Sequence, residues 1–344
     1  MPGEGTATDP APRSARRVVL GAVVIGRNEG PRLAACLASL QPRTDHIVYV
    51  DSGSTDDSLA IATAQGVTVV ELDLSRPFTA ARARNAGAER LLAEHPAVEL
   101  IQFVDGDCEL FPRWLEVALH RLADDPSIAV LCGRRRERRP EASVYNLLCD
   151  IEWNTPVGEA LACGGDSLVR ASAFREAGGF DDGLIAGEEP ELCMRLRRGG
   201  WRVVRVAQDM TRHDADMTHF GQWWKRTKRA GYAFAAVSRR NAGREERLWV
   251  REARSALLWG ALWPASMAAL ALPTAGASLV AGTALFFKPS LGAYRQARAR
   301  GYGRGPARAY AFFLALAKLP EAAGVLRFHR LRLSGDRATL IEYK

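Results

Sequence analysis

The sequence lacks the features that identify several large classes of protein. Its six cysteines include no Cys-x-x-Cys pair, which argues against a zinc site or a small disulfide scaffold, and we expect reduced cytosolic thiols. No internal repeat is visible. A mean hydropathy of −0.13 excludes a polytopic membrane protein. With 47% apolar and 25% charged residues, the 344-residue chain has an ordinary globular composition and is long enough for two domains.

We also expect no cleavable export signal. Two arginines precede the apolar stretch 18–25, and residues 33–36 imitate a lipoprotein cleavage box, but charged residues such as Arg27 interrupt the stretch before that point. The apolar region of a signal peptide runs unbroken to its processing site. Residues 1–17, rich in Pro, Ala and Thr, predict a disordered tail instead.

Positive charge is concentrated at the C-terminal end. The chain has a net charge of +8, and residues 288–344 contain 12 Lys or Arg against three acids, so the rest is almost neutral. A basic excess confined to one end indicates contact with an anionic surface rather than a charged active site. Aromatic residues are not interleaved through this tail, and no nucleic-acid-binding module is recognisable. We therefore expect an anionic membrane surface, and no nucleic acid, as partner.

Short apolar runs alternate with amphipathic stretches from residue 18 to about residue 206. Near-continuous Val and Ile runs separated by helical patterns are typical of a parallel sheet covered by helices on both faces. Strands are predicted at 18–25, 46–50, 67–72, 99–104, 128–132 and 201–206. Helices are predicted at 32–40, 54–65 (capped by Ser54 or Thr55), 78–93, 113–123 and 192–198.

The stretch 255–287 contains no charged residue. Pro264 and a turn at 273–276 divide it into two halves that are short for membrane-spanning helices, which need about 20 apolar residues. Arg251 and Arg254 flank one end and the basic tail the other, so the positive-inside tendency places both flanks in the cytoplasm. The stretch predicts a membrane hairpin or re-entrant segment. A buried pair of soluble helices is the alternative.

Acidic residues follow two of the predicted strands. Asp51 opens the sequence Asp-Ser-Gly-Ser-Thr-Asp, and Asp105 and Asp107 follow the strand 99–104. In an open parallel sheet, ligands bind outside the carboxyl ends of the strands. Asp51 can accept hydrogen bonds from a nucleobase or ribose, or its segment can simply cap a helix. The other pair can hold a divalent cation against a diphosphate, although Asp-Gly sequences also fill turns.

Three further features could take part in chemistry. Glu188 and Glu189 precede Pro190, which suits the first position of a helix, so both acids are expected in the non-helical approach to it. There the positive helix end would keep a general base ionised, or the acids would only compensate the helix dipole. The glycine loop 164–166 permits close backbone approach. His213 could complete a metal site or contact a phosphate, or be structural.

Together these residues resemble family 2 glycosyltransferases, which have the GT-A fold, are inverting and depend on a metal ion. The segment 222–226 is also similar to the Gln-x-x-Arg-Trp motif of processive synthases, but Lys225 and Arg226 stand where Arg and Trp are expected, so we expect transfer of one or a few sugars. The resemblance covers about residues 18–215, and its motifs occur in the family's order at 23–29, 51–56, 82–87, 105–107, 178–180 and 188–189.

The resemblance implies a role for each matching residue. Glu189 would be the catalytic base, with Glu188 as the alternative because Glu189 replaces the Asp that is usual in the family. Asp107 would bind the metal ion, Mg²⁺ or Mn²⁺, together with Asp105 and His213. The residues that would bind the donor are Asn28, Glu29, Asp51, Arg84, Asn85, Asp105, Gly165 and Asp166.

The expected architecture is an α/β GT-A domain, Rossmann-like with a mostly parallel sheet, followed by a C-terminal helical, membrane-associated region. The GT-A domain would span 18–215, with a nucleotide-sugar half at about 18–107 and an acceptor half at about 108–215. The C-terminal region would comprise amphipathic interface helices at 216–254, the membrane segment 255–287 and a basic helical tail at 288–344.

The predicted function is transfer of a sugar from a nucleotide-diphosphate sugar, with a UDP-sugar favoured, to an acceptor hydroxyl at the cytoplasmic face of the cell membrane. The acceptor would be lipid-linked or an intermediate of the cell envelope or exopolysaccharide. A nucleotidyltransferase is one alternative, but the segment 25–30 lacks the Gly- and Arg-rich phosphate loop expected of it. A non-catalytic membrane-binding protein is another, but it would not need these acids together. We interpret the basic run 134–139 as a solvated loop or as a contact for headgroups or an anionic acceptor.

Overall fold

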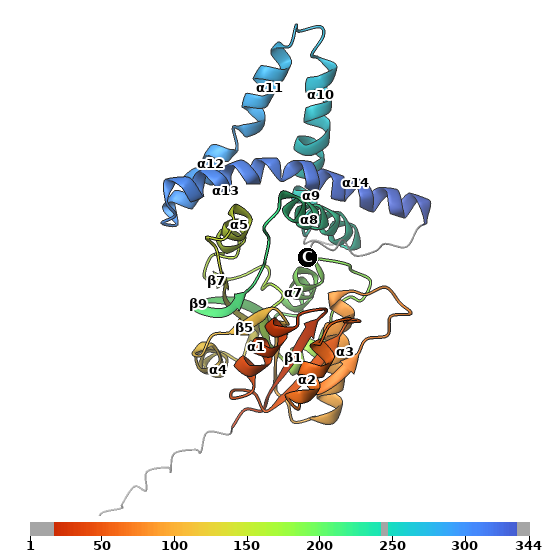
Figure 1. Ribbon diagram of the computed structural model, residues 1–344, viewed down its shortest axis with the longest axis vertical. Coiled ribbons are helices and arrows are strands. Elements are labelled where there is room, and N and C mark those ends of the chain that lie inside the picture. The colour runs from red at the N-terminus through yellow and green to blue at the C-terminus, as the bar shows by residue number, and fades with distance from the viewer. Residues whose placement is uncertain (1–16, 242–246, 336–344) are drawn as a thin grey trace, which may run out of the picture.

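A nine-stranded sheet forms the centre of the N-terminal domain in the computed structural model (Figure 1), which describes residues 17–241 and 247–335. The predicted tail, apart from its last residue, lies outside the described residues. The strands are ordered β3-β2-β1-β4-β8-β6-β9-β5, with β7 paired to β9. Their bounds are β1 Leu20–Gly26, β2 His46–Asp51, β3 Thr68–Glu71, β4 Leu100–Asp105, β5 Cys108–Leu110, β6 Ile128–Glu137, β7 Gly158–Glu159, β8 Ser167–Arg170 and β9 Arg202–His213.

The two halves of the sheet differ in strand direction. In the first half β1 pairs in parallel with β2 and β4, and β2 pairs in parallel with β3. In the second half β8 is antiparallel to its neighbours β4 and β6, and β5 and β7 are antiparallel to β9, whereas β6 and β9 are parallel. The predicted α/β class is confirmed, with antiparallel strands confined to the second half.

Helices cover both faces of this sheet, as the apolar runs predict. Successive residues of β1 enter different cores: Ala22 and Val24 pack in one buried cluster with α1 and α4, and Val23 and Ile25 in another with α3. This alternation follows from the two-residue period of a strand. The helices of the domain are α1 Pro31–Leu40, α2 Ser58–Ala64, α3 Ala80–Glu94, α4 Trp114–Asp124, α5 Val144–Glu152, α6 Ala171–Glu176 and α7 Glu188–Arg198.

Strands β6 and β9 are longer than the sequence predicts. They extend past the predicted ends at 132 and 206 to Glu137 and His213, and their extensions pair with each other, for example Arg136 beside Arg212. The apolar pattern ends early because the extensions contain many charged side chains. The interpretation of residues 134–137 as part of a solvated loop is therefore wrong, since they form the end of a strand.

Helix α7 also begins earlier than predicted. Gly187 precedes it with φ of 87°, and the helix starts at Glu188. Glu188 and Glu189 therefore lie in the first helical turn, with Pro190 as the third helical residue, and not in the non-helical approach that we expected. A left-handed φ suits glycine, which has no Cβ to clash. The backbone conformation of Gly187 thus sets the start of α7 and with it the positions of Glu188 and Glu189.

From Phe220 onward the described chain is helical (Figure 1). Helices α13 and α14 follow each other closely and lie across the N-terminal domain. Helices α10 and α11 form a hairpin that projects away from it. The elements are α8 Phe220–Arg240, α9 Val250–Leu257, a π-helical segment Leu258–Leu262, α10 Trp263–Ala269, α11 Ala277–Phe287, α12 Ser290–Ala299, α13 Arg304–Leu316 and α14 Lys318–Ser334.

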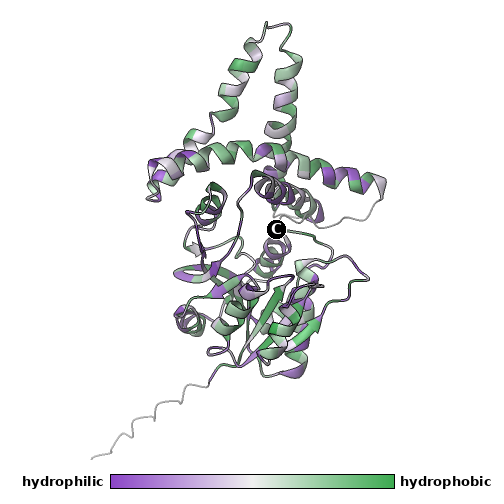
Figure 2. Cartoon of the chain, in the orientation of Figure 1, coloured by the Kyte–Doolittle hydropathy of each residue, from purple (hydrophilic) through white to green (hydrophobic). Residues whose placement is uncertain are grey.

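The hairpin exposes large apolar side chains. Figure 2 shows it mostly in the colours of apolar and neutral residues. At its tip Leu272 is 94% exposed, and on α11 Val280 is 76% exposed. The predicted alternative of a buried soluble helix pair is therefore wrong. Residues 304–334 form the one described helix that is long and apolar enough to cross a membrane, although 44% of its apolar window is buried within the protein.

Candidate functional site

The sheet brings the strand-end acids to one edge. In the paired register Asp51 lies beside Gly26 of β1, and Asp105 lies beside Ile25 on the other side of the same strand. Because β1, β2 and β4 are parallel, their carboxyl ends meet at this edge, where open α/β sheets bind ligands. The two acids therefore flank the end of β1, as their positions after apolar strands predict.

Asp51 is buried and organises the turn that follows it. Its Oδ2 accepts hydrogen bonds from the backbone N–H groups of Gly53 at 2.9 Å and Ser54 at 2.8 Å. Its Oδ1 accepts from the hydroxyls of Tyr49 at 2.9 Å and Ser54 at 2.5 Å. Burial and the nearby Asp51 carboxylate raise the pKa of Tyr49, so the phenol remains a donor. These bonds show that Asp51 fixes the turn at 51–54, at the edge of the sheet where the sequence predicts the donor.

Asn28 and Glu29 are tied to the segment after β2. The Asn28 N–H donates to Ser54 Oγ at 2.9 Å, and its side-chain Oδ1 accepts from the Thr55 N–H at 2.7 Å. The Glu29 N–H donates to Ser58 Oγ at 3.1 Å. Ser54 and Thr55 therefore bond to Asn28 and do not cap α2. The helix begins at Ser58 and not at the predicted residue 54. The two predicted nucleotide-binding loops are thereby fixed to each other.

Asp105 lies between two arginines. Arg84 of α3 places Nη2 2.7 Å from Asp105 Oδ1 and Nη1 2.6 Å from Glu188 Oε1. Arg135 of β6 places Nη2 3.3 Å from Asp105 Oδ2 and 2.8 Å from Asp166 Oδ2. Burial alone would raise the pKa of Asp105, but Arg84 and Arg135 outweigh it and hold that pKa well below its usual range. Asp105 is therefore ionised, and both its oxygens are engaged.

Asp166 is an interior residue of this network. It is fully buried, its Oδ1 accepts the Asp105 backbone N–H at 2.9 Å, and its Oδ2 accepts the Thr211 hydroxyl at 2.6 Å. These bonds indicate a positioning role instead of the predicted direct contact with the donor. The preceding Gly165 lies so close that a Cβ there would be 2.6 Å from Arg84 Nη2. The glycine loop thus lies directly over the network, as close backbone approach requires.

Asn85 also acts within the protein. Its side-chain amide donates to the Phe180 carbonyl at 2.8 Å and to Asp182 Oδ1 at 2.7 Å, and its Oδ1 accepts the Phe180 N–H at 2.9 Å. All of these groups belong to the loop after Gly178-Gly179. The bonds indicate that Asn85 holds this loop in place, and its contact with a donor stays a prediction.

Asp107 and His213 face each other at the edge of the sheet. His213, the last residue of β9, places Nε2 3.4 Å from Asp107 Oδ2, and both side chains are almost fully buried. Its Nδ1 lies 3.8 Å from Glu137 Oε2 and has no hydrogen-bond partner within the described part of the chain. In metal sites the second imidazole nitrogen usually donates to a carboxylate. Glu137 lies in the direction of such a partner but beyond hydrogen-bond distance. The indole of Trp153 packs edge-on against the ring, with centroids 4.8 Å apart.

These residues fit a divalent cation, although not in the predicted combination. One carboxylate, one imidazole and positions left for phosphate oxygens and water suit Mg²⁺ or Mn²⁺. Asp107, Cys108 and His213 offer ligand atoms within 4.8 Å of one another. Asp105 belongs instead to a group with Cys108 and Asp166, and both its oxygens are paired with arginines. Asp107 and His213 are therefore the stronger candidate ligands.

The two candidate bases point to different surroundings. Glu188 belongs to the arginine network through Arg84. Glu189 accepts hydrogen bonds at Oε1 from the backbone N–H of Cys163 and, at 3.5 Å, from the Cys193 thiol. Glu189 thus faces the loop that covers the network, and it is not committed to an arginine.

Sequence reasoning missed Arg135, Glu137 and Trp153. Arg135 and Glu137 lie two residues apart on β6, so they share one face of the strand and both point toward the site. Strand periodicity within the run 134–139 is the signal that could have found them, but the density of charge there suggested a solvated loop. Trp153 carried no such signal, because only the position of α5 brings it to His213. The same position places the Trp153 ring centroid 5.5 Å from Arg135 Cζ.

Comparisons with known proteins agree with this geometry. Residues 22–158 match the model of Glycosyl transferase family 2, and residues 158–314 match that of Glycosyl transferase family group 2. An O-antigen chain rhamnosyltransferase of Salmonella typhimurium is 24% identical over 51% of this chain and 58% of its own. A pre-mycofactocin glycosyltransferase of Mycobacterium tuberculosis is 27% identical over 47% of this chain and 35% of its own. The match thus spans a little more than half the length of the first relative and about a third of the second.

A solved structure shares the fold over nearly the whole chain. The mannosyltransferase of Pyrobaculum calidifontis, solved with GDP-Man and Mn²⁺, has a TM-score of 0.59 and 19% identity, covering 93% of this chain and 90% of its own. At that identity the likeness establishes the fold alone. It extends beyond the sheet into the C-terminal helices, because the coverage is almost complete.

The arginine network predicts a large effect of Arg135→Met on stability. Removing the guanidinium leaves the buried Asp166 carboxylate without its cation, so we expect a loss of about 3–5 kcal/mol in unfolding free energy, measured by urea denaturation. Arg136→Met is the matched control: that residue is 41% exposed and lies 3.7 Å from Asp209, so about 0–1 kcal/mol is expected. Equal losses in the two variants would contradict the central role of Arg135.

Proposed function

Because the chain belongs to glycosyltransferase family 2, we propose that it transfers a sugar, with inversion, from a nucleotide-diphosphate sugar to an acceptor hydroxyl. The observation that carries this proposal is the single sheet edge where Asp51, Asp105 and Asp107 meet the N-terminus of α7 with its two glutamates. Donor-shaping groups, a cation site and a candidate base are thus assembled in one place.

Each group has a distinct part in the proposed reaction. Asp51 and Asn28 shape the pocket for the nucleoside, and Asp107 with His213 holds the divalent cation. When bound, that cation supplies positive charge that stabilises the departing diphosphate. Glu189 takes the proton from the acceptor hydroxyl as its oxygen attacks the anomeric carbon. The arginine network around Asp105 keeps the edge of the sheet and the loop over it in place.

The substrates are proposed from the family and from the relatives. UDP-sugars are the favoured donors because they are the family's commonest. The relatives named for O-antigen chain synthesis and for succinoglycan biosynthesis support an acceptor that is a lipid-linked or envelope-polysaccharide intermediate. The fit of the sequence to the processive motif at 222–226 is poor, which supports transfer of one or a few sugars.

We further propose that the hairpin anchors the enzyme in the cytoplasmic leaflet. At 1.5 Å per residue, the helical stretch from Leu258 to Ala269 is about 18 Å long and α11 about 16 Å. The hydrocarbon core is about 30 Å thick, so each arm reaches roughly halfway across. Arg251 and Arg254 precede the hairpin and Lys288 follows it, and these cations suit anionic headgroups. Such a hairpin enters and leaves on one side.

Metal dependence is tested by removing the ligand and the ion. We expect Asp107→Ala to abolish turnover of a UDP-sugar, and EDTA to abolish it in the unchanged enzyme until Mn²⁺ is restored. The direct measurement is Mn²⁺ binding by calorimetry, which Asp107→Ala should weaken beyond detection. Full turnover in EDTA, with no tightly held metal, would refute the metal-dependent mechanism.

The base is tested by isosteric amides. Glu189→Gln keeps the size of the side chain but cannot take the proton, so we expect transfer to fall about 10²–10⁴-fold while nucleotide-sugar binding is retained. Glu188→Gln should instead weaken the contact with Arg84 and lower thermal stability. If Glu189→Gln transfers at the normal rate and Glu188→Gln does not, Glu188 is the base.

Membrane attachment is tested at the tip of the hairpin. Val280→Asp places a carboxylate in the hydrocarbon at a cost of roughly 3 kcal/mol, so we expect the protein to leave the membrane fraction during a carbonate wash. Val157→Asp, at another exposed valine (59%) in the N-terminal domain, is the control and should stay membrane-bound. A fully soluble unchanged protein, active at full rate on a water-soluble acceptor, would exclude the anchor.

A further inference from the structure

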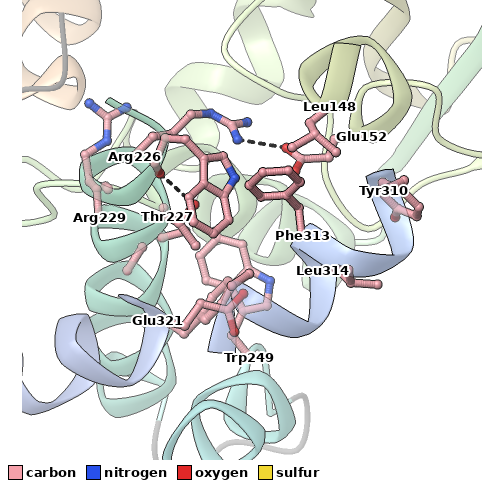
Figure 3. Close-up of a pocket in the computed structure, with 17 residues that line it drawn as sticks. Leu148, Glu152, Arg226, Thr227, Arg229, Trp249, Tyr310, Phe313, Leu314 and Glu321 are labelled. Carbon is pink, nitrogen blue, oxygen red and sulfur yellow. Dashed lines mark hydrogen bonds and ion pairs between the residues drawn. The ribbon is translucent and has the colours of Figure 1, made fainter. Parts of the chain in front are cut away.

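A cavity of about 390 Å³ lies between the N-terminal domain and the C-terminal helices (Figure 3). Its walls come from α5, from the residues just before α7, from α8, and from α13 and the start of α14. None of the residues in the predicted site lines it, so it is separate from the metal and donor positions. Its volume falls in the range of small-molecule sites, about 300–1,000 Å³.

The lining is apolar and aromatic with a polar rim. Trp223 of α8 and Phe313 of α13 meet edge to face, with ring centroids 5.0 Å apart, and Trp249 lies on another wall. At the rim Arg226 forms an ion pair with Glu152 at 2.8 Å (Figure 3). Glu321, at the start of α14, lies on a separate wall. An apolar chamber with a few charged groups around it suits a hydrophobic chain that ends in a polar head.

One wall of the cavity is the backbone that leads into the candidate base. Gly187 lines the cavity and immediately precedes Glu188 and Glu189. A Cβ at Gly187 would lie 2.7 Å from atoms of both Trp249 and Val237, so the bare backbone fits closely against this wall. A molecule in the cavity therefore lies against the backbone that immediately precedes the first turn of α7.

The opposite wall faces the proposed membrane surface. Leu314 of α13 lines the cavity and is still 40% exposed, and the neighbouring Phe312 is 48% exposed. Phe312 stacks on Phe287 at the foot of the hairpin, with ring centroids 5.5 Å apart. The cavity wall is thus continuous with the apolar hairpin through these aromatic rings.

From these observations we infer that the cavity holds the hydrocarbon chain of a lipid-linked acceptor next to its phosphate. This rests on the proposed function and adds where the acceptor binds. Arg226 and Arg229 of α8 are the two cations in the lining, beside the acids Glu152 and Glu321, and the phosphate takes the place of Glu152 next to Arg226 (Figure 3). The chain enters past Leu314 from the leaflet that holds the hairpin. The polar end of the acceptor then lies near Gly187, two residues before Glu189 in the chain.

The inference is tested by photolabelling the full-length protein in nanodiscs. The probe is farnesyl phosphate with a diazirine on its terminal isoprene unit, and labelled peptides are located by mass spectrometry. We expect label on α8 and α13, and about tenfold less of it in Ala230→Leu, whose larger side chain fills the cavity. Gly221→Leu is the control: it lies on the same helix, outside the cavity lining, and a Cβ there meets nothing within 4 Å.

The outcomes separate this inference from the proposed function. Label confined to the hairpin 258–287 would overturn the inference, and so would label in α8 that Ala230→Leu does not reduce. If the variant does not fold, the positions labelled in the unchanged protein decide the question. Nucleotide-sugar binding is measured on the same samples. Labelling of the cavity without such binding would refute the proposed transferase and leave the lipid site standing. Nucleotide-sugar binding with no label in the cavity would refute the lipid site and leave the proposed transferase standing.

Discussion

The contact of Asp105 with Arg84 and Arg135 is the interaction on which the arrangement of the site depends. It joins the end of β4 to α3 and to the extended strand β6, and through Arg84 it reaches Glu188 at the start of α7. A buried carboxylate is stable only with such partners. Arg135 also pairs with Asp166 and thereby holds the loop over the site. Elements far apart in the chain therefore share one set of charges.

A second set of contacts joins the site to the C-terminal helices. The Tyr302 hydroxyl, between α12 and α13, accepts a hydrogen bond from the Asn154 side chain at 3.1 Å. Asn154 follows Trp153, whose ring packs against His213 at the candidate cation site. The segment that follows the hairpin therefore contacts Asn154, the neighbour of the residue that packs on His213. The C-terminal helices and the candidate cation site are thus connected through the end of α5.

Much of the architecture was predictable because its causes are local. A two-residue or 3.6-residue period of apolar side chains can be read along the chain, so the strands and helices of the first half lie close to their predicted positions. Asp51 and Asp105 could be assigned to one edge because parallel strands end there together. The hairpin followed from the uncharged stretch 255–287. Predicted boundaries differed from the structure where charged residues continued a strand, as in β6 and β9, and where the segment after β2 bonds to Asn28, so that α2 begins only at Ser58.

The sequence by itself determined the order of elements up to β4, the family and the sheet edge that carries the acids, since each depends on neighbouring residues. It did not predict β5, β7, β8, α5 or α6. Only the tertiary structure decided which acids remain for a ligand. Asp105 and Asp166 are occupied by Arg135 because strand β6 extends beside β9, a pairing between distant segments that local periodicity does not encode. The pairing of β5 with β9, another contact between distant segments, brings His213 to Asp107. Ion pairs of this kind depend on strand register and on the packing of whole elements, and both arise only when the chain has folded.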